Sequence, residues 1–202
     1  QIVAGHDSID PIASRVPPPD FSAAVNRGVK GLRIAWSPDY GYANVDPEVV
    51  DIAEKGARLF EDLGCSVEET NFTLTEPFER AFWPIFSANG YAAHRSDLEN
   101  HAEDLSWYVR ECLEYGATVT GEQYAQALGY VDRLKGQLAD LLETYDLLLS
   151  PTMAIPAFPH GNPPNKIGGN TVKRPYWDFL PFTFPINMAG HPAASVPSGF
   201  SK

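Results

Sequence analysis

Ser37 and Ser150 are candidate nucleophiles, because each follows an apolar, strand-like run and each precedes a proline. A serine nucleophile needs a general base within hydrogen-bond distance, and His160 and His191 are candidate bases in this chain. Neither serine lies in a G-x-S-x-G pattern. The spacing in the sequence does not show that either histidine lies close to a serine. We therefore favour a structural role, in which the serines hydrogen bond to turn backbone.

A second candidate site is a set of metal-ligand residues on one predicted helix. His94 is followed three residues later by Asp97 and seven residues later by His101, so the three could share a helix face. A metal site needs three or four convergent ligands with supporting hydrogen bonds. Acidic residues crowd this segment, which is typical of a solvated face. We predict no metal site here.

Two other groups of residues are better explained by structure than by ligand binding. The segment IGGN, residues 167–170, lacks the G-x-x-x-x-G-K pattern and a strand directly before it, so we predict a surface turn and not a phosphate loop. No motif in the sequence indicates a cofactor. Apolar side chains normally bury against one another. We expect core positions for Phe82, Trp83, Phe86 and Trp107.

Composition limits the class of partner. The chain has 202 residues, with 26 acidic and 15 basic side chains and a formal net charge of -11. This sign disfavours direct binding to nucleic acid or to an anionic membrane. The two cysteines, Cys65 and Cys112, fit a reducing cytosol better than a disulfide framework. The first residues, QIVAGHDSID, lack a signal-peptide pattern, and no apolar run approaches the ~20 residues that span a bilayer. We expect a cytoplasmic protein.

The first third of the chain predicts an irregular arm followed by a strand–helix–strand unit. Residues 1–31 are rich in proline, which lacks an amide donor and resists regular structure. Residues 32–37 and 66–69 have the composition of strands, and between them Asp46 can cap a helix that Gly64 ends. Short links in such a unit predict parallel strands and a right-handed crossover.

The middle of the chain predicts helices. Residues 75–143 have apolar side chains at helical spacing. Pro84 should break or kink the first of these helices, because its ring removes one hydrogen bond of the helix. Thr120 and Gln123 predict a capping box at the start of the last one.

The last quarter predicts two strands separated by a long loop. Residues 146–152 form a short apolar run that is typical of a buried strand. Residues 156–182 are irregular, and loops of this length are often functional. Gly190 and Pro192 then predict a tight entry into a final strand, Ala193–Val196, whose small side chains would allow close packing.

Four stretches resemble, in order, segments of the amidase signature family of C–N hydrolases. They are AGHDSIDP from residue 4, GLRIAWSPDYGYANVDPEV from 31, YDLLLSPTMAIPAF from 145 and TFPINMAGHPAASVPSGF from 183. The resemblance implies an α/β protein, part of a three-layer α/β/α fold with a mixed sheet. It also implies a single α/β domain over residues 32–202 after the arm 1–31, with a helical insertion at about 75–143, incomplete relative to the family.

The family's Ser–cis-Ser–Lys triad has no counterpart in these residues. No Gly/Ser-rich signature is present, and no lysine lies in a matching context. By the order of the family, the signature would precede residue 1, and a further strand and helix would follow Lys202. The resemblance therefore implies a C-terminal-half piece without catalytic residues, and we expect the isolated chain to be inactive.

The resemblance also implies positions that face the substrate. In the family the turn after the late strand lies near the substrate, which indicates Thr152 and the residues up to Pro156. The helical insertion often shapes the acyl pocket, which indicates Phe82 and Phe86. Asn187 matches a recurrent family position, and its alternative is a structural role in satisfying buried loop backbone.

The resulting prediction is a portion of an amidase that hydrolyses a carboxamide C–N bond through a serine acyl-enzyme. Its partner would be a small-molecule amide. A homodimer is a further possibility that the sequence does not decide. One alternative is a glutaminase similar to the ammonia-releasing subunit of glutamyl-tRNA(Gln) amidotransferase, in which Arg80, Arg95 and Arg110 could bind the charged ends of glutamine. The other alternative is a non-catalytic binding or scaffold domain of hydrolase-like fold.

Overall fold

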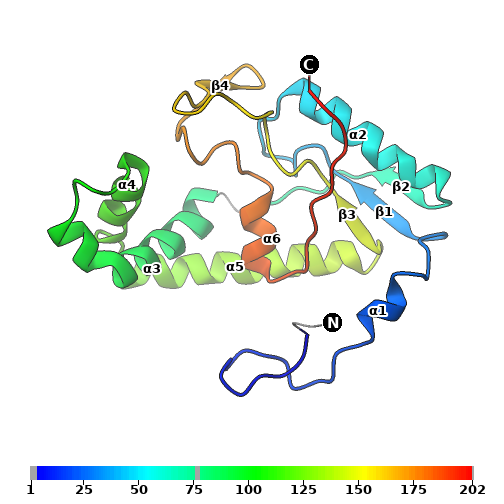
Figure 1. Ribbon diagram of the computed structural model, residues 1–202, viewed down its shortest axis with the longest axis horizontal. Helices are drawn as coiled ribbons and strands as arrows, with labels where there is room; N and C mark the ends of the chain where they lie inside the picture. Colours follow the sequence, from blue (N-terminus) through cyan, green and yellow to red (C-terminus); the bar gives the residue numbers. More distant parts are fainter. Residues whose placement is uncertain (1–3, 76–77, 202) are drawn as a thin grey trace.

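The computed structural model describes residues 4–75 and 78–201 (Figure 1). Among these residues no helix is both long and apolar enough to cross a membrane. In chain order the elements are α1 (Phe21–Ala24), β1 (Arg33–Trp36), α2 (Pro47–Asp62), β2 (Ser66–Glu69), α3 (Phe78–Asn100), α4 (Trp107–Gly116), α5 (Gly121–Leu142), β3 (Leu147–Leu149), β4 (Lys166–Ile167), β5 (Asn170–Thr171) and α6 (Thr183–Ala189).

The central sheet has the strand order β2-β1-β3, and β1 pairs in parallel with both neighbours. In this register Ile34 lies opposite Val67 of β2 and Leu147 of β3. Helix α2 connects β1 to β2, so the predicted strand–helix–strand unit is confirmed. Antiparallel pairing occurs in the separate hairpin of β4 and β5.

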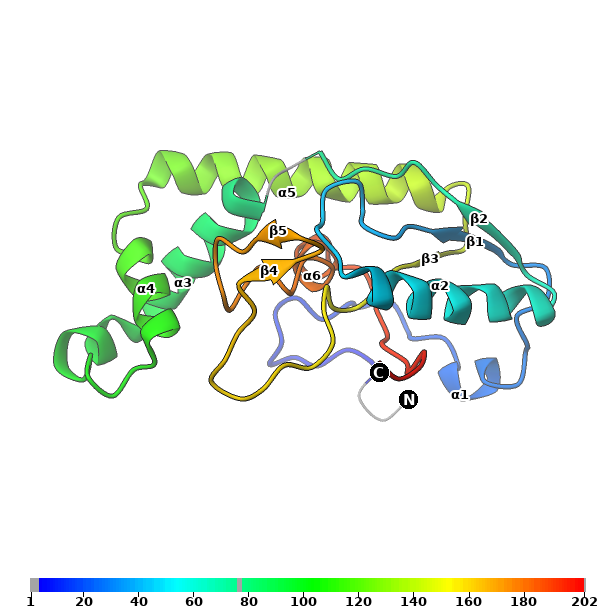
Figure 2. The same ribbon diagram turned by 90° about the horizontal axis from the view of Figure 1, so that it is seen from above.

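Helices cover both faces of the sheet, with α2 on one side and α5 on the other (Figure 2). Side chains alternate between the faces of a strand, and neighbouring residues of β3 accordingly join different cores. Leu149 packs against the core cluster that includes Ile34 and Ala57 of α2. Leu148 packs against the other core cluster, which includes Leu138 of α5. The three layers therefore follow from continuous apolar runs in short strands, whose successive side chains point to opposite and covered faces of the sheet.

The two helices with capping signals begin where those signals place them. Asp46 Oδ1 accepts a hydrogen bond of 2.9 Å from the Glu48 amide at the start of α2. Thr120 and Gln123 form both hydrogen bonds of the capping box that precedes α5. After α2, Gly64 has a φ of +85°, a conformation that glycine adopts without steric cost. These local predictions are confirmed.

Pro84 was predicted to break or kink its helix, and the break does not occur. Helix α3 continues through Pro84 to Asn100, and its irregular backbone lies instead at His94, with a φ of -120° and a ψ of 18°. Trp83, next to the proline, is only 4% exposed, and α3 packs against both α4 and α5. This packing outweighs the single helical hydrogen bond that proline removes.

The predicted strand Ala193–Val196 is also not formed. Residues 191–201 are extended but belong to none of the described sheets, and Val196 is 72% exposed. A strand needs a neighbour for its amides and carbonyls, and no described strand pairs with this segment. Helix α6 forms before it, and Gly190 ends that helix with a φ of +73°.

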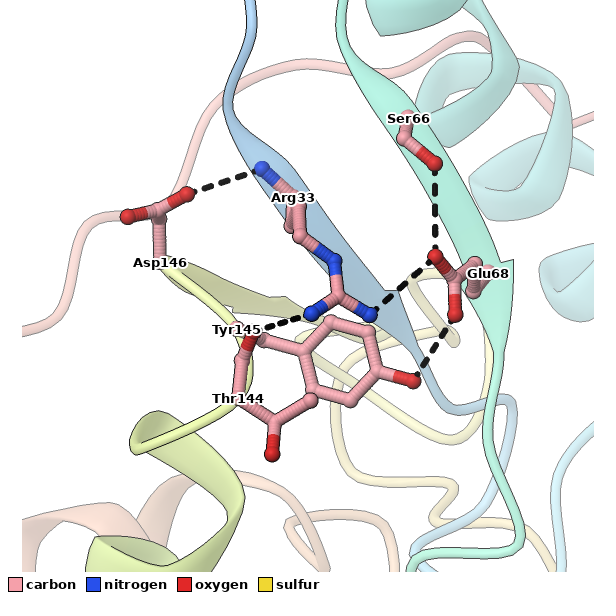
Figure 3. A network of polar contacts seen from close by, with 6 residues as sticks. All are labelled: Arg33, Ser66, Glu68, Thr144, Tyr145 and Asp146. Atoms are coloured by element: carbon pink, nitrogen blue, oxygen red, sulfur yellow. Dashed lines mark hydrogen bonds and ion pairs between the residues drawn. The ribbon is translucent and has the colours of Figure 1, made fainter.

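A polar network ties together the amino ends of the three parallel strands (Figure 3). Arg33 Nη2 lies 3.5 Å from Glu68 Oε1, and its Nη1 donates to the Thr144 carbonyl at 3.1 Å. The guanidinium lies over the ring of Tyr145, whose hydroxyl donates to Glu68 Oε2 at 3.1 Å. The Arg33 amide donates to Asp146 at 2.8 Å. The network links β1, β2 and β3 at this edge.

Candidate functional site

An apolar cavity of about 550 Å³ lies between α3, α4, α6 and the loop that precedes α6. Helix α3 contributes Phe82 and Phe86, which share one face because they are four residues apart. Helix α4 contributes Val109, and α6 contributes Asn187 and Met188. The volume and the mainly apolar lining are those of a small-molecule site. The cavity brings together Phe82, Phe86 and Asn187, three of the five residues predicted to face a substrate.

Aromatic rings form one wall of this cavity. The ring centroids of Phe82 and Phe86 are 4.8 Å apart with an interplanar angle of 17°. Trp177 meets both Phe86 and Trp83 edge-on, each at 5.2 Å. Trp83 is 4% exposed, as predicted for the core, but Phe86 is 42% and Trp107 48% exposed. The core prediction is wrong for these two, because Phe86 lines the open cavity and Trp107 begins α4 at the surface.

Two reactive side chains also line the cavity, Cys112 and His94. Cys112 Sγ lies 3.3 Å from Ser87 Oγ, and burial raises the pKa of the Cys112 thiol. Because the thiolate is the nucleophilic form, this environment disfavours covalent chemistry at Cys112. His94 Nδ1 lies 3.0 Å from the carboxylate of Asp97. The lining is thus suited to binding and not to nucleophilic attack.

A second cavity, of about 320 Å³, lies against the β4–β5 hairpin and has several polar side chains in its lining. Among them Asn170 Nδ2 donates to Asn44 Oδ1 at 2.8 Å. The IGGN segment forms the predicted turn, in which Gly168 has a φ of +54°. A Cβ atom at Gly168 would lie 2.5 Å from the carbonyl oxygen of Val45. Glycine therefore allows the hairpin to approach the loop before α2.

The two candidate nucleophiles end the neighbouring strands β1 and β3. Ser37 Oγ accepts a hydrogen bond of 3.0 Å from the Tyr40 amide. Ser150 Oγ lies 2.8 Å from the Tyr40 hydroxyl. Within the described part of the chain, neither serine has a hydrogen bond to His160 or His191. Both serines thus hydrogen bond to turn backbone, Ser37 to the Tyr40 amide and Ser150 to the Pro151 carbonyl at 3.0 Å, and the absence of a catalytic role stays a prediction.

The phenol of Tyr40 makes stability sensitive to alkaline pH. Burial is the main cause that raises the pKa of Tyr40 above its ordinary value of 10.0. A group whose pKa is raised by folding contributes stability that is fully present below the unfolded pKa and is lost as pH rises through the folded pKa. We therefore expect the free energy of unfolding to decline above about pH 10. Urea titrations at a series of pH values measure this decline.

The matched variant for this test is Tyr40→Phe, which keeps the buried ring without an ionisable group. It should lose about 1 kcal/mol at neutral pH, because the contact with Ser150 is removed. It should also show a shallower alkaline decline than the native chain. An alkaline decline of equal slope in both proteins would show that Tyr40 is not the responsible group.

The candidate metal ligands do not converge on one point. His94 pairs with Asp97 on the surface, and His101 Nδ1 lies 3.9 Å from Asp104 Oδ2. In residues 4–75 and 78–201, no three His, Cys, Asp or Glu side chains converge in a way that could hold a metal ion. The candidate ligands therefore do not form one site.

Thr152 and Pro156 follow β3 and lie outside the linings of both cavities. Thr152 is exposed, and its Oγ1 lies 3.0 Å from Ser195 Oγ. The turn after β3 is thereby attached to the extended C-terminal segment. A contact of Thr152 or Pro156 with a substrate stays a prediction.

Comparison with known proteins places this fold in a family. A profile of the Amidase family matches residues 1–202. The chain belongs to the Amidase family. It is similar to an acylamidase from Rhodococcus erythropolis, with 33% identity over 99% of this chain and 42% of that relative. It is also similar to a glutamyl-tRNA(Gln) amidotransferase subunit from Lacticaseibacillus casei, with 31% identity over 98% of this chain and 45% of that relative.

A solved structure supports the same family assignment. A bacterial aryl acylamidase of the amidase signature family matches 98% of this chain and 43% of its own chain, with a TM-score of 0.84 and 26% identity. The predicted α/β fold of amidase signature enzymes is therefore confirmed. This Amidase family chain spans less than half the length of the relatives it matches.

Sequence reasoning missed part of the cavity lining. Tyr108, Trp177 and Met188 line the apolar cavity and were not among the predicted site residues. They come from α4, from the loop before α6 and from α6, and only tertiary packing brings them together. One signal was available in the sequence, because PYWDFLPF, residues 175–182, is an aromatic-rich run inside a long loop.

Proposed function

We propose that these residues form a substrate-binding part of an enzyme that hydrolyses a carboxamide C–N bond through a serine acyl-enzyme. Membership of the Amidase family is the observation that carries this proposal. The serine oxygen would attack the amide carbonyl, and the C–N bond would break as the leaving amine takes up a proton. Water would then attack the acyl-serine ester and release the carboxylic acid. Backbone amides would stabilise the oxyanion.

The nucleophile and its base are proposed to come from residues outside this sequence. Ser37 and Ser150 support this view, because their hydroxyl groups are engaged by Tyr40 in turn structure. The buried, protonated thiol of Cys112 supports it as well. The described chain would then supply the shape of the substrate site, and the remaining polypeptide would supply the chemistry.

The proposed substrate contacts follow from the apolar cavity. Phe82 and Phe86 would contact an apolar arm of the amide, and Asn187 would offer the carboxamide a polar partner at the same cavity. Thr152 and Pro156 lie outside this cavity, and their proposed contact with the substrate rests on the family resemblance of the turn after β3. The partner is a small-molecule amide, with no direct contact to nucleic acid.

The glutaminase alternative has support from the similarity to the amidotransferase of Lacticaseibacillus casei. Its substrate carries an ammonium and a carboxylate, which a buried site must pair with charged groups. The contacts of the three candidate arginines do not support this alternative. Arg95 pairs with Glu99 at 2.6 Å, and neither Arg80 nor Arg110 lines a described cavity. The mainly apolar lining of the cavity that contains Phe82, Phe86 and Asn187 therefore favours an uncharged amide.

Turnover of 4-nitroacetanilide tests the proposal. We expect no release of 4-nitroaniline by residues 1–202 alone, and release by the longer gene product that contains them. Turnover by the 202 residues that is abolished by Ser37→Ala or Ser150→Ala would overturn the proposal. A thermal-shift screen with amides tests the scaffold alternative. That alternative predicts that no amide stabilises residues 1–202 or the longer gene product. It also predicts a specific protein partner for residues 1–202.

A further inference from the structure

Trp177 is the one residue common to the linings of both cavities among the residues that the structure describes. It lies in the loop between β5 and α6, the loop that passes from the polar cavity to the apolar one. Phe184 lines the polar cavity and packs against Phe82 of the apolar cavity, with ring centroids 5.2 Å apart. The two cavities are therefore neighbours, and a small number of aromatic rings separates them.

The two cavities differ in chemistry. The apolar cavity is lined by aromatic and aliphatic side chains such as Phe86, Leu113 and Met188. The lining of the other includes the polar side chains of Asn44 and Asn170. The ring of Trp177 stands between the two linings, so its position decides how far an apolar ligand can extend from the larger cavity toward the smaller one.

The ring of Trp177 is held in place from several sides. It meets Trp83 and Phe86 edge-on, at interplanar angles of 70° and 68°. Its amide donates to the Arg174 carbonyl at 2.9 Å. The next residue, Asp178, accepts hydrogen bonds from the amides of Lys173 and Arg174 at 2.6 and 3.0 Å. A ring fixed in this way can act as a wall, because movement would break several contacts at once.

The indole nitrogen adds an independent sign that this residue is not placed for stability alone. Trp177 Nε1 is buried and has no hydrogen-bond partner in the described part of the chain. A buried donor without a partner costs free energy that a phenylalanine at the same place would not. The phenyl ring of Trp177→Phe would fill most of the same space without the N–H donor, whereas Trp177→Ala removes the ring as well. The two variants therefore test the donor and the ring separately.

We propose that Trp177 is a specificity-determining residue, which forms the wall of the apolar cavity toward the polar cavity and thereby limits the length of the apolar arm of an uncharged amide substrate. This inference rests on the proposed amide hydrolysis and deepens it. The substrate class is an amide with a compact apolar acyl group, aryl or short alkyl. Longer linear acyl groups are excluded because the ring of Trp177 occupies the space into which they would extend.

The test uses the full gene product and a series of N-acyl-4-nitroanilides from acetyl to decanoyl. In the native enzyme, kcat/KM should rise with chain length and then fall sharply. In Trp177→Ala the fall should move to longer chains, so that the ratio of kcat/KM for decanoyl over acetyl rises by about 10- to 100-fold. In Trp177→Phe, which keeps a ring but loses the N–H, this ratio should stay within about threefold of the native value.

An unchanged length limit in a folded Trp177→Ala protein, with native circular dichroism, would overturn the inference. Where the alanine variant does not fold, Trp177→Leu serves the same comparison. Failure of the proposed hydrolysis is recognised separately, because the native enzyme would then release no 4-nitroaniline from any member of the series. In that case calorimetric affinities of N-phenylalkanamides test the wall directly. Longer chains should bind more tightly to the alanine variant than to the native protein, and equal affinities would overturn the inference.

Discussion

Replacement of Gly116 by alanine is expected to lower the free energy of unfolding by about 3 kcal/mol or more. Gly116 is the last residue of α4, and a Cβ atom there would lie 2.1 Å from the Ser87 carbonyl oxygen in α3. The obstacle is rigid helix backbone, which cannot rotate aside as a long side chain can. The two helices would have to separate, and both line the apolar cavity. Urea unfolding followed by circular dichroism measures the loss.

Gly136→Ala is the matched control for this prediction. Gly136 lies within α5, and a Cβ atom there would meet nothing within 4 Å among the described residues outside its own helical turn. Alanine favours the helix over glycine, so this variant should gain about 0.5–1 kcal/mol. Opposite signs for the two substitutions are expected, and a loss of similar size in both would show that the contact between α3 and α4 is not as tight as the structure indicates.

Introduction of a carboxylate at Val109 is expected to lower kcat/KM for apolar acyl nitroanilides by about 100-fold, which corresponds to about 2.7 kcal/mol. Val109 lies on α4, is half-buried and lines the apolar cavity. A charge that a bound apolar group covers loses its hydration without gaining a partner. The enzyme would then bind apolar arms poorly, while its unfolding transition should change much less than its activity. Steady-state kinetics of the full gene product measure the effect.

The control for Val109→Asp is Val109→Asn, which has nearly the same size and no charge. It should retain about tenfold more activity than the aspartate variant, because a neutral amide is cheaper to desolvate than a carboxylate. Equal activity of the native enzyme and the aspartate variant would place the apolar arm of the substrate elsewhere than in this cavity.

The local elements were predictable because their signals involve residues close together in the chain. Asp46 and Pro47 mark the start of α2, and Gly64 marks its end, through hydrogen bonds and dihedral preferences that act within one turn. The capping box at Thr120 is of the same kind. Parallel pairing of β1 and β2 followed from the short strand–helix–strand links.

The predictions that the structure contradicts concern features that depend on residues far apart in the sequence. Pro84 remains inside α3 because α4 and α5 pack against that helix, and no local signal carries this information. Ala193–Val196 was predicted as a strand but has no neighbour to pair with in the described chain. Phe86 has the apolar character of a core residue, and only the arrangement of α3, α4 and α6 makes it part of a cavity wall.

The residues of the candidate site also divide into those that the sequence indicated and those that only tertiary contacts revealed. The resemblance to the amidase signature family indicated Phe82, Phe86 and Asn187, and the structure places these three around one cavity. Trp177, in a loop more than 90 residues from Phe82, entered the site only through tertiary contacts. Patterns within the chain were sufficient for the family, the strand–helix–strand unit and the capped helices, because each of these depends on residues close together in the sequence. The two cavities and the aromatic wall between them emerged only when the chain was folded, because a cavity is enclosed by side chains whose proximity no local pattern encodes.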